Sequence, residues 1–244
     1  MKEGKWILEE NREIARNVFR MTLRGDARDI TRPGQFVNIC LEGLFLRRPI
    51  SVCDWEADRL TLIYKTVGRG TEQMSRLAPG TELDLLTGLG NGYDLDPAGD
   101  HPVLLGGGVG VPPLYGLARR LRERGTAVTA VLGFNTREEV FAEEAFRALS
   151  CRVLVATADG SYGEKGFVTD VLPEEYSYVY ACGPEPMLRA VHRAVKTSGQ
   201  FSLEERMGCG FGACMGCSRE MRSGMKRVCA DGPVFDKEDV IWQI

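Results

Sequence analysis

The most constraining feature of this sequence is a group of four cysteines close to its C-terminal end. Cys209, Cys214, Cys217 and Cys229 follow one another with the spacing C-x4-C-x2-C-x11-C. The spacing C-x4-C-x2-C with a more distant fourth cysteine is that of plant-type [2Fe–2S] centres. Thiolates on one tight loop must converge on two irons, so small neighbouring residues are needed. Such residues are present in and beside the loop: Gly208, Gly210, Gly212, Ala213 and Gly216.

The segment that carries these cysteines needs such a centre to be stable. From Phe201 onward the chain shows little hydrophobic periodicity, and about 45 residues of this kind cannot bury enough apolar surface to offset their chain entropy. A structural zinc site would normally show two C-x2-C pairs, whereas only Cys214 and Cys217 form one. We therefore predict a small irregular iron–sulfur domain at residues 201–244, with zinc or chance grouping as alternatives.

Composition and charge argue against several classes of function. The chain has 244 residues, and 31 Lys and Arg stand against 34 Asp and Glu, a formal net charge of −3. A nucleic-acid-binding protein would normally carry a basic excess. No apolar run approaches the roughly 18 residues of a membrane span, and the N-terminus lacks a secretory signal. We therefore expect a cytoplasmic protein, in which clustered cysteines indicate a metal site rather than disulfides.

Residues 1–97 have the pattern of a small antiparallel β-barrel. Six short segments are rich in strand-forming residues and are separated by turn signals such as Arg-Pro-Gly and Ala-Pro-Gly. These segments are Trp6–Leu8, Val18–Leu23, Gln35–Leu41, Ile50–Trp55, Leu60–Lys65 and Glu82–Leu86. One short helix is predicted at Thr71–Leu77. Six short strands in about 85 residues are typical of a barrel.

Residues 98–200 alternate between strands and helices. The predicted strands are Val103–Leu105, Val128–Phe134, Arg152–Ala156 and Tyr178–Cys182, and the predicted helices are Leu114–Arg124, Arg137–Leu149 and Glu185–Lys196. This alternation predicts an α/β domain, in which a parallel sheet carries helices on both faces. The turn-rich segment Asp96–Asp100 marks the boundary with the barrel.

A glycine-rich turn follows the first strand of this predicted sheet. Residues 106–113 read Gly-Gly-Gly-Val-Gly-Val-Pro-Pro and lead into a helix. Backbone N–H groups and a helix N-terminus at such a turn can bind a pyrophosphate. The run does not match G-x-G-x-x-G, because Val111 or Pro113 stands where the last glycine is required. A simple tight turn is the alternative to a nucleotide site that contains Gly106, Gly107, Gly108 and Gly110.

Three further motifs are candidate ligand contacts. Arg47–Ser51 reads Arg-Arg-Pro-Ile-Ser, in which arginine can bind a phosphate through two hydrogen bonds and serine can reach a flavin ring edge. Lys65–Thr71 is a basic, glycine-containing turn before a helix. The motif Cys-Gly-Pro-Glu-Pro-Met begins at Cys182, at the end of a strand, where open α/β sheets bind their ligands. Taken singly, each motif also fits an ordinary turn or strand end.

Together, these motifs make the chain similar to the ferredoxin–NADP reductase superfamily. The order is Arg-Pro-Ile-Ser, then Gly-Gly-Gly-Val-Gly-Val-Pro-Pro, then Cys-Gly-Pro-Glu-Pro-Met, and finally the cysteine-rich run of residues 202–217. With this last run, the chain resembles the electron-transfer subunits of type B dihydroorotate dehydrogenases over essentially its whole length. The resemblance implies FAD on the barrel, NAD(H) on the α/β domain and a [2Fe–2S] cluster on the tail.

The resemblance also implies roles for individual residues. Ser51 would donate or accept a hydrogen bond near the flavin N5, and Cys182 would lie beside the nicotinamide, followed by Gly183 and Pro184. One departure is that members often carry Gly-Pro-Leu-Gly-Asn-Gly where residues 87–92 read Thr-Gly-Leu-Gly-Asn-Gly. The implied FAD site consists of Arg48, Pro49, Ile50, Ser51, Ile63, Tyr64, Lys65, Gly70 and Thr71.

The function that the resemblance implies is electron transfer to a partner. NADH would give a hydride to FAD, and single electrons would pass through the cluster to the FMN of a dihydroorotate dehydrogenase catalytic subunit, in a heterotetramer with two copies of each. The alternative is the small subunit of an NADH-dependent ferredoxin:NADP oxidoreductase, a sulfide dehydrogenase or a similar reductase. A carrier without reductase activity is a third possibility. Arg137 could favour a 2′-phosphate, but Glu138 and Glu139 disfavour it, so we expect NADH.

Overall fold

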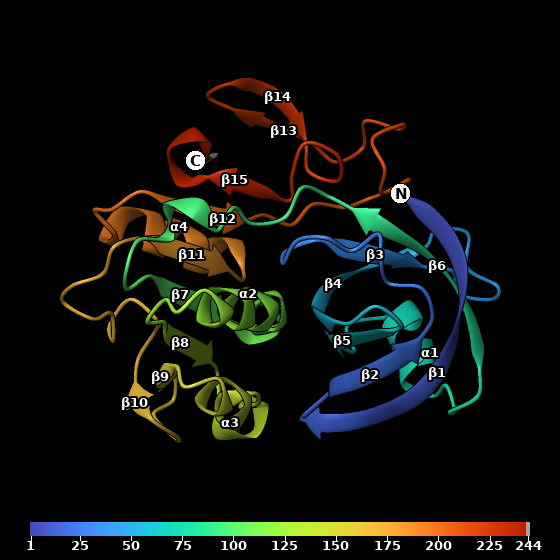
Figure 1. Cartoon of the computed structure of the whole chain (residues 1–244), viewed down its shortest axis with the longest axis horizontal. Helices are drawn as coiled ribbons and strands as arrows, with labels where there is room; N and C mark the ends of the chain where they lie inside the picture. Colours follow the sequence, from blue (N-terminus) through green and yellow to red (C-terminus); the bar gives the residue numbers. More distant parts are fainter. Residues whose placement is uncertain (243–244) are drawn as a thin grey trace.

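Alternating apolar residues in the first part of the chain close a six-stranded antiparallel barrel, as predicted. The computed structural model describes residues 1–242, and the barrel lies on the right in Figure 1. Its strands are β1 (Lys2–Ala15), β2 (Val18–Arg24), β3 (Phe36–Ile39), β4 (Arg48–Trp55), β5 (Arg59–Lys65) and β6 (Glu82–Leu89), in the closed order β1-β2-β5-β4-β3-β6. Helix α1 (Arg69–Ser75) connects β5 to β6. The interior is filled by buried side chains such as Trp6, Met21, Leu23, Leu60 and Leu62.

Strand β1 is much longer than the predicted strand Trp6–Leu8. The charged stretch from Glu9 to Glu13 hides the apolar alternation, but its side chains are exposed or half-buried on a strand that continues to Ala15. The first half of β1 pairs with β6 and the second half pairs with β2, with register shifts after Leu8 and Glu13. Bulges of this kind bend a strand, so β1 can pair with β6 along its first half and with β2 along its second half.

The middle of the chain forms the predicted α/β unit (left in Figure 1). Its sheet has the strand order β10-β9-β8-β7-β11-β12-β15, and all pairs are parallel except β12 with β15. The strands are β7 (Val103–Gly107), β8 (Thr129–Phe134), β9 (Arg152–Thr157), β10 (Glu164–Lys165), β11 (Val179–Cys182), β12 (Gly199–Ser202) and β15 (Val234–Asp236). The helices are α2 (Val111–Glu123), α3 (Glu143–Ala148) and α4 (Glu185–Ala194), and short 3₁₀ turns occupy Asp96–Ala98, Gly108–Gly110, Arg137–Glu139 and Lys237–Asp239.

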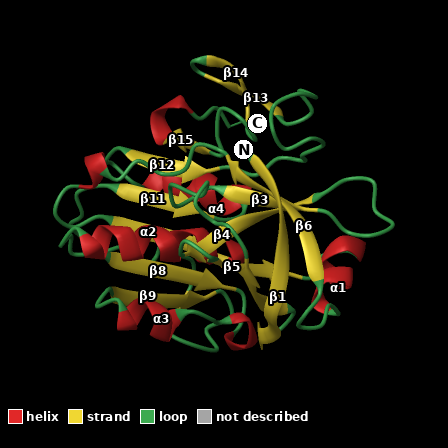
Figure 2. Cartoon of the chain, turned by 45° about the vertical axis from the view of Figure 1, so that its right-hand side comes forward, coloured by secondary structure: helices red, strands yellow, loops and turns green. Residues whose placement is uncertain are grey.

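Helices cover both faces of this sheet, as the alternating pattern predicts. Leu104 of β7 points to the face where it shares a core with residues of α2 and α3. Its neighbours Val103 and Leu105 point to the other face, where they share a core with Leu188 of α4. Figure 2 shows the parallel strands side by side between these layers. No helix among residues 1–242 is long and apolar enough to cross a membrane.

The predicted helix Arg137–Leu149 is wrong in its first half. A 3₁₀ turn covers Arg137–Glu139, the backbone then extends, and Ala142 has a left-handed φ of 64° before α3 begins at Glu143. Contacts with the barrel explain the break. The carbonyl of Glu138 accepts a hydrogen bond from the Arg16 backbone N–H at 3.0 Å, and the Glu139 carboxylate pairs with Lys65 at 2.8 Å.

We expect Ala142→Gly to stabilise the protein by about 0.5–1 kcal/mol, because a left-handed alanine is strained and glycine is not. Ala148→Gly, at the last residue of α3, is the matched control and should cost up to about 1 kcal/mol, because this residue still has a helical backbone. Thermal unfolding of both variants gives the comparison. If Ala142→Gly destabilised the protein as Ala148→Gly does, residue 142 would have to be helical.

The tail is more ordered than predicted. After β12, it forms a hairpin of β13 (Ser218–Met221) and β14 (Gly224–Arg227) and returns as β15, which pairs antiparallel with β12. The predicted domain boundary at residue 200 therefore falls inside β12. In Figures 1 and 2 the tail lies across both the barrel and the α/β unit, at the top. This position brings the cysteines beside the junction of the other two units.

Helix α2 joins the two larger units tightly. A Cβ on Gly116 would lie 2.7 Å from the carbonyl oxygen of Cys53 in β4, so only glycine permits this approach. Arg119 pairs with Asp54 at 2.8 Å, and the Arg120 guanidinium lies 4.6 Å from the centre of a Trp55 ring. Burial raises the pKa of Asp54 although Arg119 opposes it. This packing fixes the orientation of the α/β unit against the barrel.

Candidate functional site

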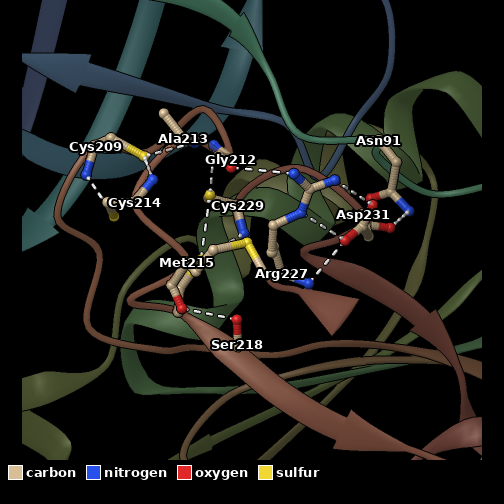
Figure 3. Close-up of polar contacts among 11 residues, drawn as sticks. Asn91, Cys209, Gly212, Ala213, Cys214, Met215, Ser218, Arg227, Cys229 and Asp231 are labelled. Atoms are coloured by element: carbon tan, nitrogen blue, oxygen red, sulfur yellow. Dashed lines mark hydrogen bonds and ion pairs between the residues drawn. The ribbon is translucent and has the colours of Figure 1, made fainter. Parts of the chain in front are cut away.

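The four cysteines form two pairs, and Figure 3 labels three of them, Cys209, Cys214 and Cys229. The Sγ atoms of Cys217 and Cys229 are 3.2 Å apart. Cys209 and Cys214 each donate a backbone N–H to the sulfur of the other at 3.4 Å. Within residues 1–242, no three His, Cys, Asp or Glu side chains surround a single metal position. Two neighbouring pairs of cysteines would suit a centre of two irons, with two thiolates for each iron.

Backbone N–H groups surround the sulfurs. Hydrogen bonds of this kind stabilise thiolate charge and tune the potential of an iron–sulfur centre. The loop can provide them because its residues are small and several have left-handed backbones, including Gly210 and Gly212. The remaining contacts are Gly212 to Cys229 at 3.1 Å, Ala213 to Cys209 at 3.2 Å, Cys229 to Cys217 at 3.4 Å and Gly216 to Cys214 at 3.5 Å.

Arg227 connects the cysteine loop at Gly212 to the segment that follows Cys229. Its guanidinium donates a hydrogen bond to the Gly212 carbonyl at 3.0 Å and pairs with Asp231 at 3.1 Å. Gly212 has a φ of 90°, and a Cβ there would lie 2.8 Å from the Cβ of Ala230. A larger residue at position 212 would therefore push the loop away from Cys229.

The cysteines differ in exposure and in proton affinity. Burial raises the pKa of Cys209, but backbone hydrogen bonds from Phe211 and Cys214 outweigh it and lower the pKa to about 6. Burial raises the pKa of Cys229 to about 12, so metal binding there must displace a proton. Cys214 is exposed, and Phe211 and Met215 beside it are 46% and 56% exposed. The outer side of the loop is thus open and apolar.

A cavity of about 400 Å³ lies between the barrel and the α/β unit. Nearly all residues of the predicted FAD site line it, together with Cys182 at the end of β11. Its walls combine apolar side chains with a few polar groups, as small-molecule sites usually do. The predicted residues in this wall are Arg48, Pro49, Ile50, Ser51, Ile63, Tyr64, Lys65, Thr71 and Cys182.

Gly70 is the one residue of the predicted FAD site that does not line the cavity. It is buried at the start of α1, and a Cβ there would lie 2.2 Å from the Arg48 Nε. Its role is therefore to leave room for the Arg48 side chain. Thr71 shapes the same turn, because its hydroxyl donates to the Gly68 carbonyl at 3.1 Å and accepts the Val67 N–H at 2.9 Å.

A second cavity, of about 300 Å³, lies at the C-terminal ends of the parallel strands. Gly107, Gly108 and Gly110 line it at the N-terminus of α2, and Gly183 and Pro184 line it at the N-terminus of α4. Gly106 does not reach this cavity. It lies inside β7, where a Cβ would be 2.8 Å from a methyl group of Val111, so it serves the packing of α2 on the sheet.

The two cavities share three lining residues, Lys65, Val109 and Glu204. Cys182 lies at this junction and is only 3% exposed. Burial raises the pKa of its thiol to about 12, so the thiol stays neutral at physiological pH. Desolvation also raises the pKa of Glu204, although its side chain is exposed toward the cavities. Ligands in the two cavities would therefore meet at these shared residues.

Several lining residues were not predicted. Ser202, Leu203, Met207 and Pro233 line the first cavity because β12 and β15 join the sheet, and no apolar alternation indicated those strands. Asn135 and Glu139 line the second cavity. Burial raises the pKa of Glu139, but hydrogen bonds from Lys65 at 2.8 Å and from Asn135 outweigh this and lower it.

A larger cavity, of about 650 Å³, lies between the barrel and α3. Ile63 is the only residue from the predicted sites that lines it. Its charged lining residues are of both signs, including Arg12, Arg20, Glu143 and Glu144, and no glycine-rich turn or helix N-terminus of α2 or α4 opens into it. It therefore lacks the glycine-rich turn of residues 106–110, which contributes to the lining of the other two cavities.

Comparisons with known proteins agree with this geometry. Residues 204–241 match a family model described as the iron–sulfur cluster binding domain of dihydroorotate dehydrogenase B, and residues 104–193 match an oxidoreductase NAD-binding domain. The dihydroorotate dehydrogenase B (NAD(+)) electron transfer subunit of Shouchella clausii is 43% identical, over 98% of both chains. The protein of the same name from a Geobacillus species is 43% identical over 99% of both chains.

Solved structures share the fold. A structure of the NADH-dependent reduced ferredoxin-NADP oxidoreductase is 31% identical, with a TM-score of 0.88, and the match covers 97% of this chain and 90% of that one. A flavohemoglobin from Malassezia yamatoensis with bound FAD and heme has a TM-score of 0.65 at 18% identity, covering 80% of this chain and 56% of that one. The second match supports the fold alone.

Proposed function

Because the chain belongs to the family of dihydroorotate dehydrogenase B electron transfer subunits, we propose that it passes electrons from NADH, through FAD and a [2Fe–2S] cluster, to the FMN of a separate catalytic subunit in pyrimidine biosynthesis. The observation that carries this proposal is the continuity of the three sites. The nucleotide cavity and the flavin cavity share Lys65, Val109 and Glu204. The flavin cavity is also lined by Met207 and Pro233, close in sequence to Cys209 and Cys229.

The residues that would hold FAD lie mainly within residues 1–97, and they fit this cofactor. Arg48 has a guanidinium for a phosphate, and Gly70 leaves the space that this side chain needs. Ser51 supplies a hydroxyl for the flavin ring edge near N5, and Ile50 and Ile63 supply apolar walls. Bound FAD would accept a hydride and release single electrons. The chain's task is to orient the ring and exclude water.

The NAD(H) site lies in residues 98–200. Backbone N–H groups at Gly108 and Gly110, at the N-terminus of the 13-residue helix α2, would bind the pyrophosphate. Cys182 would contact the nicotinamide as a neutral, buried thiol, because its raised pKa leaves it no acid–base role near neutral pH. Hydride transfer between stacked rings requires no such role, so positioning suffices.

The cluster site lies in residues 201–244, with Cys209, Cys214, Cys217 and Cys229 as ligands. The exposed side of the loop, with Phe211 and Met215, would face the partner. We propose a heterotetramer of two copies of each subunit, located in the cytoplasm. Native mass spectrometry of the purified complex tests the stoichiometry, and a one-to-one heterodimer would contradict it.

We expect a strong preference for NADH over NADPH. The Glu139 carboxylate lines the nucleotide cavity, its lowered pKa keeps it ionised, and it pairs with Lys65 of the same cavity at 2.8 Å. A 2′-phosphate there would be repelled by Glu139 and would have to displace it from Lys65. The repulsion of one charge by another at such a site corresponds to roughly a tenfold or greater difference in kcat/KM. Steady-state dye reduction with each nucleotide measures this ratio, and a preference for NADPH would overturn the assignment.

A second candidate is the small subunit of an NADH-dependent ferredoxin:NADP oxidoreductase, which the close structural match to that enzyme favours. The two candidates differ in the partner. Purifying the native complex and identifying the companion chain by mass spectrometry distinguishes them. Our proposal predicts an FMN-containing companion and dihydroorotate-dependent reduction of NAD⁺. A companion that reduces ferredoxin or NADP⁺, without dihydroorotate oxidation, would favour the second candidate.

A further inference from the structure

Two asparagine side chains of the barrel region hold the two ends of the set of cysteines. Asn38 lies on β3 and is 1% exposed, and its Nδ2 donates a hydrogen bond to the Cys209 carbonyl at 3.1 Å. Asn91 follows β6, and it binds the backbone of Asp231 and Val234, in the segment that begins two residues after Cys229. The first and the last cysteine are therefore each connected to the barrel through one amide.

Asn38 connects the cysteine loop to a wall of the flavin cavity. Its neighbours Val37 and Ile39 point into the barrel core, so Asn38 lies on the outer face of β3, together with Phe36. Phe36 lines the flavin cavity. Two residues along a strand span about 7 Å, so β3 carries the cavity wall and the contact with Cys209 a short distance apart on one rigid element.

The Asn38 side chain packs so closely against Gly210 that no side chain fits at position 210. A Cβ on Gly210 would lie 1.9 Å from the Asn38 Nδ2, and Gly210 has a left-handed φ of 79°. The Asn38 Oδ1 is buried and meets no hydrogen-bond donor among the described residues. A buried amide with one unsatisfied atom costs free energy, and this residue occupies a position where an apolar side chain would avoid that cost. Among the described residues, the bond to the Cys209 carbonyl is thus the one side-chain hydrogen bond that Asn38 makes.

The Asn91 side-chain amide pairs with the backbone of Val234 as a residue of a neighbouring strand would. Its Nδ2 donates to the Val234 carbonyl at 2.7 Å, and its Oδ1 accepts the Val234 N–H at 3.1 Å. The same Nδ2 lies 3.3 Å from the Asp231 carbonyl, a contact close to the pair of Asp231 with Arg227 seen in Figure 3. The Asn91 backbone N–H adds a bond to the Gly232 carbonyl at 2.7 Å. These bonds enclose Pro233, which lines the flavin cavity.

We propose that Asn38 and Asn91 are positioning residues that set the separation between the flavin and the cluster, and thereby the rate of electron transfer between them. The inference rests on the proposed function, because it requires both cofactors. Electron transfer between two redox centres slows steeply as their separation grows. Neither side chain lines the nucleotide cavity. Loss of either amide should therefore slow reduction of the cluster while leaving reduction of the flavin by NADH unchanged.

The test compares Asn38→Ala and Asn91→Ala with the unmodified protein and with Leu60→Ala. Leu60 is a fully buried barrel residue outside all three sites, so its variant controls for lost stability. After anaerobic mixing with NADH, absorbance follows the flavin and the cluster separately. We expect cluster reduction to slow severalfold in both asparagine variants, with a changed magnetic coupling between the flavin radical and the reduced cluster. Leu60→Ala should lower Tm only.

Cluster reduction at the unmodified rate with unchanged coupling in both asparagine variants would overturn the proposal. If an alanine variant fails to retain its cluster, Asn91→Asp decides, because it keeps the acceptor for the Val234 N–H and loses both donors. A slowed rate in Asn91→Asp supports the proposal, and the unmodified rate contradicts it. Failure of the proposed cofactors is distinguishable, because the unmodified protein would then lack flavin or cluster bands. Failure of the proposed partner does not affect this test, because the measured step lies within this chain.

Discussion

Replacing Cys214 with serine is expected to remove the iron–sulfur cluster and to lower the rate at which NADH reduces the partner's flavin by about a hundredfold or more. Cys214 and Cys209 form the more exposed of the two cysteine pairs, and the loss of Cys214 would leave Cys209 without a second thiolate for the same iron. The other pair, Cys217 and Cys229, should stay in place because both residues are buried. The measurement is anaerobic turnover with the partner, together with the iron content.

Reduction of a flavin-level dye by NADH should largely survive in Cys214→Ser. The nucleotide and flavin cavities do not include Cys214, so hydride transfer has no need of it. Cys40→Ser is the matched control, because Cys40 is also an exposed free cysteine but lies on the barrel. It should retain the cluster and full activity. Loss of dye reduction together with the cluster in Cys214→Ser would mean that the order of electron transfer is wrong.

Gly110→Ala is expected to lower the rate of flavin reduction by NADH by about a hundredfold, because a displacement of about 1 Å in a site can have this effect. A Cβ at this position would lie 2.2 Å from the Cys182 carbonyl oxygen and 2.6 Å from the Gly183 nitrogen. Backbone atoms cannot rotate away, so the turn that follows β11 must move. The change would displace Cys182 and the pyrophosphate site together.

Gly125→Ala, at the opposite end of α2 and outside both cavities, is the matched control for this variant. A Cβ on Gly125 would meet no atom within 4 Å, although its φ of 83° makes alanine strained there. We expect a loss of about 1–2 kcal/mol in stability and a much smaller effect on the rate. Stopped-flow measurement of flavin reduction compares the two variants. Equal rates in Gly110→Ala and the unmodified protein would show that the turn at Cys182 does not position the nicotinamide.

Much of the fold could be predicted because each unit has its own periodicity. The alternation of apolar residues indicated the barrel, and strands followed by helices indicated the parallel sheet. Local sequence patterns did not predict the secondary structure correctly where contacts between distant segments determine it. The single helix predicted over residues 137–149 is interrupted because Glu138 and Glu139 bind the barrel. Strand β15 forms only because β12 offers it an edge.

The predicted site residues were mostly brought together, because their motifs stand at strand ends and turns that the fold makes converge. Gly106 and Gly70 are exceptions, since a glycine required for packing looks the same in sequence as one that contacts a ligand. Asn38 carried no signal in the sequence, and Asn91 stood only within the run Leu-Gly-Asn-Gly, to which no role was assigned. A single asparagine in a strand or a turn has many ordinary explanations, and only the folded chain shows that both contact the cysteine segment.

The most direct test of the account is the composition and magnetic state of the chain purified without air. We predict flavin, with iron and acid-labile sulfide in equal amounts at two each per chain, as a [2Fe–2S] centre requires. Addition of NADH alone should then produce the paramagnetic resonance of a reduced cluster, because the three sites are continuous. Zinc without sulfide, or an iron centre that dithionite reduces but NADH does not, would contradict the account.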